Sequence, residues 1–238
     1  MIPKIIHYCW FGGNPLPPLA VKCMDSWKKH CGDFEIKEWN ENNFDISMTR
    51  YSKEAAEREK WAFVADIARF YTMYQYGGLY FDIDVEVVKP IDGFLDTGMF
   101  IGFESDVEIN TGQGFGAEKN FYLVKKMLDI YNETPFINPD GTSNMTPSPK
   151  YTSKIMEAEG FVLNNTRQTI GNIEVYPTEY FCPKDWRNDE TIITPNTYTV
   201  HHFMASWWGD EERAQHESIM RFHKTAKRFQ RATKNKET

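Results

Sequence analysis

Two aspartates, Asp82 and Asp84, are separated by one residue inside a mostly apolar stretch, residues 79–88, which ends before Pro90. The stretch predicts a strand, and strand side chains alternate between two faces. We therefore expect Tyr80, Asp82, Asp84 and Glu86 on one face. The other face would carry Phe81, Ile83, Val85 and Val87, which suit a core.

Two close carboxylates repel each other, and burying them is unfavourable unless a cation compensates. Hard oxygen ligands with open coordination positions suit Mg²⁺ or Mn²⁺, the ions that bridge diphosphate oxygens. An Asp-x-Asp triplet alone is common, and a solvated strand end would also explain Asp82 and Asp84. The elements around the pair must decide between these interpretations.

The segment before the strand predicts a helix over residues 54–75, capped by Ser52. Asp66 and Arg69 are three residues apart and would share a face of this helix. Gly77 and the glycine after it would end the helix and lead directly into the acidic strand. Its buried face would carry Phe63, Ile67, Phe70 and Tyr74.

The order of the remaining elements predicts an α/β fold. A strand over 5–11, a helix over 19–29 and a strand over 34–39 form a βαβ unit with a parallel sheet. Residues 135–149 read as a long loop, a kind that is usually functional or disordered. Further strands are expected over 100–103, 173–176 and 197–203, and further helices over 120–132 and 150–159.

Composition narrows the class of protein. A length of 238 residues suits one domain spanning 1–238. A net charge of −7 argues against nucleic acid as the main partner. The four cysteines show no metal-site spacing, which predicts buried free thiols in a reducing compartment. With no signal peptide pattern and no apolar run of membrane-spanning length, we expect a cytoplasmic location.

Three motifs together resemble the family-32 glycosyltransferases, which carry a sugar-binding region with a DXD motif. The central one is Ala-Asp-Ile-Ala-Arg at 65–69 followed by Tyr-Gln-Tyr-Gly-Gly-Leu-Tyr-Phe-Asp-Ile-Asp at 74–84. The opening 2–12 and the late His-His-Phe-Met-Ala-Ser-Trp-Trp at 201–208 also resemble that family. Its members include capsular polysaccharide enzymes and initiating mannosyltransferases of yeast, and it is distantly related to clostridial glucosylating toxins. Residues 120–196 carry no such resemblance.

The resemblance implies a GT-A fold, Rossmann-like, with a mixed and mainly parallel sheet flanked by helices. It implies a retaining enzyme that moves a hexose from a nucleotide-diphosphate sugar, by analogy a UDP-sugar, to a glycan acceptor in surface or capsular polysaccharide assembly. Asp82 and Asp84 would bind Mn²⁺ or Mg²⁺, with His201 or His202 as a further ligand. Asp66, Arg69, Asp82 and Asp84 would be the catalytic set. Donor contacts would come from Trp10, Phe11, Asp66, Arg69, Tyr80, Asp82, Asn110, Ser206, Trp207 and Trp208.

Some of these residues have plainer interpretations. Trp10 could equally be a core residue, and a lone histidine is more often structural than a ligand. The glycine-rich run after Asn110 does not have the spacing of a dinucleotide fingerprint. Two rival functions also remain: a nucleotidyltransferase or phosphohydrolase using the same acidic pair, and a non-catalytic module that binds sugar nucleotides or glycans.

The last segment, about 213–238, predicts a basic amphipathic helix. Ile219, Phe222, Ala226 and Phe229 would form its apolar face, with lysines and arginines around it. Such a helix packs on its own domain or docks on an anionic membrane surface. The second interpretation predicts peripheral contact with the inner membrane face and a lipid-linked glycan acceptor.

Overall fold

The computed structural model describes residues 1–205 and four further positions, 214, 217, 218 and 221. Three residues predicted to contact the donor, Ser206, Trp207 and Trp208, lie outside the described residues. The predicted basic helix 213–238 also lies outside them, except at those four positions.

The chain opens with the predicted βαβ unit. Strand β1 (Ile5–Cys9) pairs in parallel with β2 (Glu35–Trp39), and helix α1 (Pro18–His30) connects them. Proline at the first position of α1 leaves no amide hydrogen unsatisfied there, and Lys28, Lys29 and His30 favour its C-terminal end. The predicted α/β class is therefore confirmed from its first unit.

The main sheet is mixed. Its path is β2-β1-β3-β7-β5-β9-β8, and β6 pairs with β5. The pairs β1–β2, β1–β3 and β5–β9 are parallel, whereas β7 runs antiparallel between β3 and β5. These strands are β3 (Gly78–Tyr80), β5 (Met99–Phe103), β6 (Ile109–Asn110), β7 (Phe115–Ala117), β8 (Gln168–Ile170) and β9 (Ile173–Tyr176). Two small sheets join β10 (Lys184–Asp185) to β11 (Glu190–Thr191) and β4 (Val85–Val87) to β12 (Thr199–His201).

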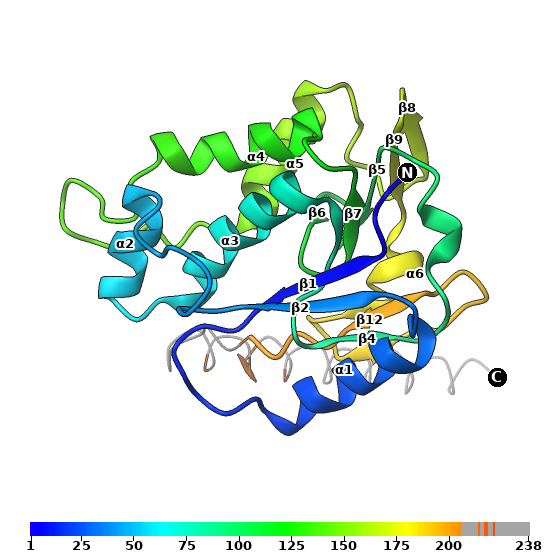
Figure 1. The fold of residues 1–238 in the computed structure, drawn as a ribbon. Helices are drawn as coiled ribbons and strands as arrows, with labels where there is room; N and C mark the ends of the chain where they lie inside the picture. Colours follow the sequence, from blue (N-terminus) through cyan, green and yellow to red (C-terminus); the bar gives the residue numbers. More distant parts are fainter. Residues whose placement is uncertain (206–213, 215–216, 219–220, 222–238) are drawn as a thin grey trace, which may run out of the picture.

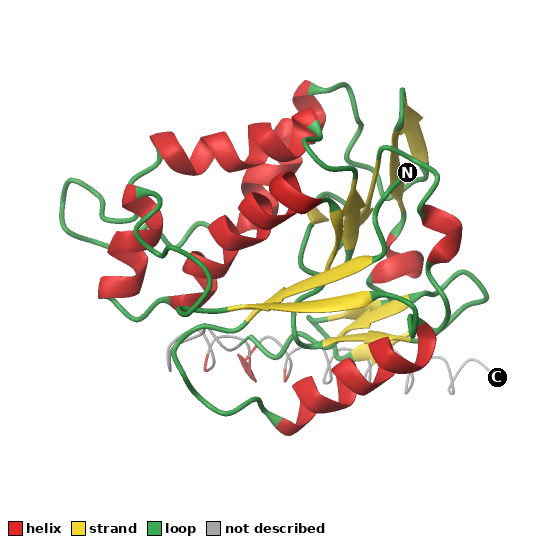
Figure 2. Ribbon diagram, viewed as in Figure 1, coloured by secondary structure: helices red, strands yellow, loops and turns green. Residues whose placement is uncertain are grey.

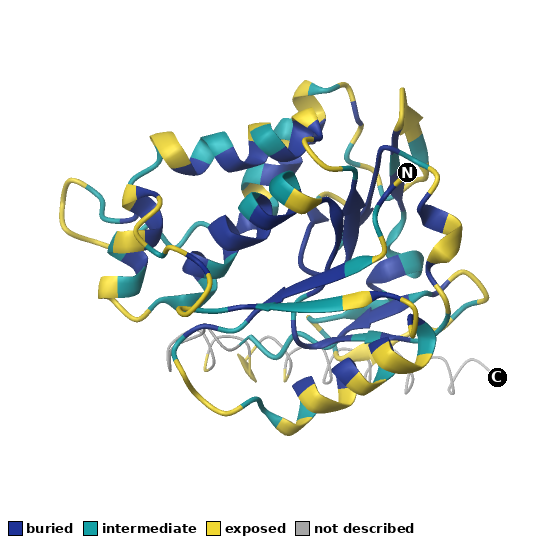
Figure 3. Ribbon diagram, in the orientation of Figure 1, coloured by how far each residue is buried: buried dark blue, intermediate teal, exposed yellow. Residues whose placement is uncertain are grey.

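Helices cover the sheet on both faces, as Figures 1 and 2 show. On one face lie α2 (Arg50–Glu57), α3 (Trp61–Tyr76), α4 (Tyr122–Glu133) and α5 (Ser148–Ala158), and on the other lie α1, α6 (Thr178–Phe181) and the short 3-10 helix Asp92–Phe94. Strand β5 separates the two cores, because Met99 and Ile101 pack with α3 and α4 whereas Phe100 packs on the α1 side. Figure 3 shows that β1, β3, β5 and β7 are largely buried between these layers, whereas the edge strands β2 and β8 are more exposed.

The predicted helix 54–75 is two helices. Thr49, not Ser52, caps α2, because its hydroxyl oxygen accepts a hydrogen bond from the Ser52 amide. The Ser52 hydroxyl oxygen in turn accepts one from the Thr49 amide, which completes a capping box. The chain then leaves the helical path at Glu59, whose φ of 56° is left-handed, before α3 begins at Trp61. The apolar spacing continues through both helices because both pack against the same core, so it did not reveal the break between them.

The predicted strand 79–88 is also interrupted. It forms β3 in the main sheet and β4 in the small sheet with β12, and the chain turns between them. The Val85 amide donates to the Asp82 carbonyl oxygen at 3.1 Å and closes this turn. The predicted division of faces holds in part, since Phe81, Ile83, Val85 and Val87 all join the core on the α1 side. The acidic pair therefore lies where the chain changes sheets.

The pattern of apolar residues did not predict β7, although it occupies the middle of the sheet. This strand is short, and glycine takes up its centre at Gly116. A Cβ atom there would lie 2.3 Å from the ring of Phe100, so the ring of β5 fills the space that a side chain would use. Glycine usually weakens a strand, which is why β7 was not predicted from residue propensities.

All four cysteines are buried and free, as predicted.

Candidate active site

A cavity of about 430 Å³ opens beside the C-terminal ends of β1, β3 and β5. Open α/β sheets commonly bind ligands at this edge, because loops there diverge and leave a cleft. Every residue of the predicted set that the structure describes lines it, apart from His202. These residues are Trp10, Phe11, Asp66, Arg69, Tyr80, Asp82, Asp84, Asn110 and His201.

Arg69 forms the centre of one cavity wall. Helix α3 places it three residues after Asp66, and its Nη1 atom lies 3.2 Å from Asp66 Oδ1. Its Nη2 atom donates to Asp82 Oδ1 at 2.8 Å. Nη1 also donates to the hydroxyls of Thr111 and Ser148, at 2.9 and 3.1 Å. The guanidinium thus ties α3, Asp82, the glycine-rich run and α5 together.

The same wall holds the carboxyl of Asp66, which is 7% exposed. Burial raises the pKa of Asp66 to about 6, although the nearby Arg69 charge acts in the opposite direction. The guanidinium of Arg69 stacks over Tyr80, with 4.6 Å between its central carbon and the ring centroid. One permanent cation therefore lies between two carboxylates and an aromatic face.

Asp82 approaches the backbone of the glycine-rich run closely. Its amide donates to the Gly112 carbonyl oxygen at 2.8 Å. A Cβ atom on Gly112 would lie only 2.0 Å from Asp82 Oδ2. The Asp82 carboxylate consequently fits between Arg69 and a residue without a side chain. This gives the glycine of the run a role that its spacing alone did not reveal.

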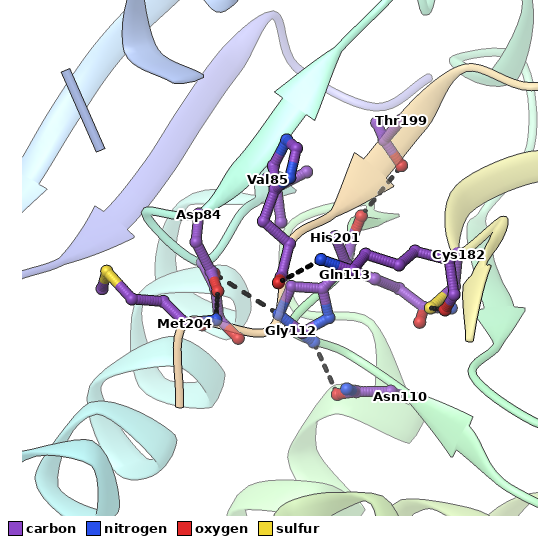
Figure 4. Close-up of polar contacts among 12 residues, drawn as sticks. Asp84, Val85, Asn110, Gly112, Gln113, Cys182, Thr199, His201 and Met204 are labelled. Carbon is purple, nitrogen blue, oxygen red and sulfur yellow. Dashed lines mark hydrogen bonds and ion pairs between the residues drawn. The ribbon is translucent and has the colours of Figure 1, made fainter. Parts of the chain in front are cut away.

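Asp84 belongs to the opposite wall, together with the end of β12. His201 Nε2 lies 3.3 Å from Asp84 Oδ1, and the Met204 amide donates to Asp84 Oδ2 at 2.6 Å (Figure 4). Burial opposes ionisation of Asp84, but His201 and the Met204 amide outweigh it and lower its pKa to about 2. Burial likewise disfavours a charged imidazole, but Asp84 raises the pKa of His201 well above its ordinary value.

The two walls together offer a ligand set for a divalent cation. Ligand atoms of Asp82, Asp84 and His201 all lie within 4.8 Å of one another. Carboxylate oxygens suit Mg²⁺ and Mn²⁺, and an imidazole nitrogen shifts the preference toward Mn²⁺ because it is a softer ligand. The residues present therefore fit a resident Mn²⁺ or Mg²⁺ ion.

Of the two candidate histidines, only His201 faces the acidic pair. His202 points instead to Glu86, with its Nε2 2.9 Å from Glu86 Oε2. Lys22 also pairs with Glu86, at 3.1 Å. Because neighbouring residues of a strand end face opposite ways, the sequence alone could not choose between these histidines.

Aromatic residues line the cavity at the end of β1. Trp10 is partly exposed, and its indole nitrogen donates to the Asn14 carbonyl oxygen at 2.6 Å. Phe11 is buried and packs edge-on against Phe44, with 5.9 Å between ring centroids. Trp61, at the start of α3, also lines the cavity, although no sequence pattern indicated it. These rings form a surface on which a planar base could stack.

Several polar residues were not predicted from the sequence: Ser148 and Glu104 line the cavity, and Thr111 is buried next to it. Thr111 and Ser148 accept hydrogen bonds from Arg69. Ser148 starts α5 inside the segment 135–149, which was expected to be a long loop of a functional or disordered kind. Glu104 follows β5 and accepts a hydrogen bond from Asn110. Its position as the first polar residue after a predicted strand was a usable signal.

Comparisons with known proteins agree with this site. Residues 17–101 match the family described as "Glycosyltransferase sugar-binding region containing DXD motif". An uncharacterized glycosyltransferase of Acanthamoeba polyphaga mimivirus is 26% identical over 226 residues, which cover 87% of this chain and 84% of the relative. Inositol phosphoceramide mannosyltransferase 3 of Schizosaccharomyces pombe is 28% identical over 51% of this chain, but the match covers only 35% of that relative.

A solved structure shares the fold. The PaToxG glycosyltransferase matches with a TM-score of 0.52 and 17% identity, covering 66% of this chain and 69% of its own. The matched segment 17–101 contains Asp66, Arg69, Asp82 and Asp84, which the structure brings together in one cavity. The chain is therefore a glycosyltransferase of the GT-A fold, and its segment 17–101 is similar to the family defined by a sugar-binding region with a DXD motif.

Proposed function

We propose that this glycosyltransferase is metal-dependent and transfers a hexose, with retention, from a UDP-sugar to a glycan acceptor. Its family implies a nucleotide-sugar donor and a glycan acceptor. The observation that carries the proposal is the grouping of Asp82, Asp84 and His201 inside a cavity that also contains the rings of Trp10 and Tyr80. A base, a diphosphate and a sugar each require a different chemistry, and this cavity offers all three.

Asp82, Asp84 and His201 would hold the ion. When bound, a divalent ion supplies Lewis-acid stabilisation of the negative charge on the departing diphosphate. Asp84 is held for this task by the Met204 amide, and Asp82 by Arg69. These bonds fix both carboxylates before substrate arrives, so little reorganisation is needed.

Arg69 acts mainly through position and charge. Both terminal nitrogens of its guanidinium already bind protein oxygens, which belong to Asp66, Asp82, Thr111 and Ser148. It therefore holds Asp82 in place and adds positive potential near the diphosphate. Trp10 and Tyr80 would contact the nucleoside, since their rings line the cavity at the ends of β1 and β3.

The acceptor and the pathway are further parts of the proposal. Surface polysaccharide assembly at the inner membrane face would suit the basic segment predicted over 213–238. In the described part of the chain, no helix is both long enough and apolar enough to span a bilayer. One relative is named for inositol phosphoceramide, a lipid, which supports including lipid-linked acceptors among the candidates.

The test begins with thermal unfolding of the protein with a panel of nucleoside diphosphates and nucleotide sugars, each with and without Mn²⁺. A ligand that binds only the folded state raises the unfolding midpoint by mass action. A rise that needs both Mn²⁺ and a uridine diphosphate would support the donor class. If no nucleotide shifts the midpoint under any condition, the donor and metal proposals fail together.

The stereochemistry needs a separate measurement. The anomeric configuration of the product, read by proton NMR of the first turnover, is expected to match that of the donor. An inverted product would overturn retention and leave the metal proposal intact.

A further inference from the structure

Glu104 is a cavity carboxylate to which the proposed function gives no task. It follows β5 directly, is only partly exposed and lines the cavity. The hairpin of β5 and β6 fixes its backbone, because its amide donates to the Glu108 carbonyl oxygen at 2.8 Å. Its side chain accepts a hydrogen bond from Asn110 Nδ2. The carboxylate is thus held at a defined point of the cavity wall.

The strand order places Glu104 far from the aromatic end. From β1 the sheet continues through β3 and β7 to β5. Three steps between neighbouring strands correspond to about 14 Å. Trp10 follows β1, Asp82 follows β3, and Glu104 follows β5. The acidic pair therefore lies between the aromatic rings and Glu104.

This order matches the order of groups in a nucleotide-diphosphate sugar. With the base on the β1 rings and the diphosphate at Asp82 and Asp84, the sugar would extend toward β5. A hexose presents hydroxyl groups, which are hydrogen-bond donors, and a carboxylate is an acceptor with several lone pairs. Hydrogen bonds to a charged group in a sheltered site are stronger than neutral ones.

We infer that Glu104 binds hydroxyl groups of the sugar being transferred and so determines which hexose the enzyme accepts. This inference rests on the proposed function. A site built to hydrogen-bond a hydroxyl discriminates strongly against an analogue that lacks it or directs it elsewhere, because buried polar groups are then left unpaired. Asn110 is the positioning residue, since it holds the carboxylate without needing to touch the sugar.

Glu108 provides a matched control. It belongs to the same hairpin region and also lines the cavity. Its carboxylate pairs with Lys150 at 3.6 Å, and that lysine is largely exposed. Glu108→Gln therefore removes the same charge from the same cavity without removing the proposed sugar contact.

The experiment compares wild type, Glu104→Gln, Glu104→Asp and Glu108→Gln. Calorimetry with UDP and Mn²⁺ gives the nucleotide affinity. Rates with UDP-glucose, UDP-galactose and UDP-N-acetylglucosamine give kcat/KM for three sugars on one nucleotide. Glu104→Gln is expected to keep UDP affinity within about twofold and to lower kcat/KM for the preferred donor about 30-fold, as for a lost charged hydrogen bond. The preference for that donor over the other two should fall together with kcat/KM. Glu108→Gln should keep both the kcat/KM and the donor preference of wild type.

Three results would overturn the inference: an unchanged preference between donors, an equal loss of UDP affinity and donor affinity, or the same change in Glu108→Gln. If Glu104→Gln does not fold, Glu104→Asp keeps the charge with a shorter side chain and should still alter the donor preference. Wild type that binds no nucleotide with Mn²⁺ would instead remove the proposed function itself. The UDP measurement therefore separates the two failures.

Discussion

Asp82 and Asp84 lie on two walls of the cavity, and each wall balances the negative charge of its aspartate in a different way. Asp82 pairs with Arg69, a permanent cation that also binds Asp66. Asp84 pairs with His201, whose charge depends on its environment. Arg69 and His201 are both buried, at 4% and 7% exposure, so burial alone does not distinguish the walls.

The difference indicates what each wall does. Arg69 cannot give up its proton in a protein, so its wall is a fixed scaffold that holds Asp82. His201 can become neutral and offer a lone pair, so its wall can exchange a proton for a metal ion. In the proposed metal site, Asp82 would be a ligand held in place by Arg69, and Asp84 would be a ligand stabilised by the ion itself.

The largest effect is expected for Asp84→Asn. A neutral amide is a poor ligand for a hard cation, so transfer should fall about 1,000-fold while the fold is kept. Activity assays and the Mn²⁺-dependent rise in the unfolding midpoint measure this. Asp96→Asn, an exposed change of the same kind, should leave both intact. Normal transfer by Asp84→Asn would show that the metal assignment is wrong.

Arg69→Met should affect stability most. It leaves the buried Asp66 and the partly exposed Asp82 without a cation, and the free energy of unfolding should fall by about 3 kcal/mol. Urea titration at neutral pH gives this value. His201→Gln should lower the free energy of unfolding less, since an amide can still donate a hydrogen bond to Asp84. Equal losses in the two variants would contradict the division into scaffold and exchangeable walls.

Gly112→Ala tests the scaffold wall without changing any charge. The new Cβ atom would lie 2.0 Å from Asp82 Oδ2 and must displace that carboxylate. Transfer and Mn²⁺ affinity should each fall about 100-fold, as for a disturbed ligand position. Gly93→Ala is the control, because its Cβ would meet nothing within 4 Å. Full activity of Gly112→Ala would mean that Asp82 can move freely.

A second buried histidine, His7, can be compared with His201. Among the residues that the structure describes, no carboxylate pairs with His7; its Nδ1 accepts from Trp39 Nε1 at 3.0 Å, and its Nε2 bonds to the Gly77 carbonyl oxygen at 2.9 Å. Both bonds fit a neutral imidazole protonated at Nε2. Burial lowers the pKa of His7 to about 4, the direction opposite to that of His201.

The sign of the pH effect follows from that shift. Below about pH 6.5 the unfolded chain binds a proton that folded His7 does not, so stability falls as the pH falls toward 4. Between pH 7 and pH 5 the His7 contribution is about 2 kcal/mol. His7→Gln can keep both hydrogen bonds but cannot titrate. Between pH 7 and pH 5 the variant should therefore lose about 2 kcal/mol less stability than wild type. Identical pH profiles would mean that folded His7 accepts a proton normally.

The sequence by itself determined the parts that depend on local pattern. Apolar spacing, proline and glycine signals predicted the first βαβ unit, the helix that carries Asp66 and Arg69, and an acidic pair next to them. Helix periodicity put Asp66 and Arg69 on one face, since residues three apart are neighbours there. The motifs also pointed to the family whose model matches residues 17–101, and the segment from Asp66 to Asp84 lies inside that match.

Only the tertiary structure decided how that segment is completed. The turn that sends Asp82 and Asp84 to different walls is stabilised by pairing between β4 and β12, which are more than 100 residues apart in the chain. The same pairing brings His201 rather than His202 to Asp84, and the central position of β7 brings Gly112 against Asp82. These contacts depend on strand order and register, which are set by packing over the whole sheet and leave no local pattern in the residues they join.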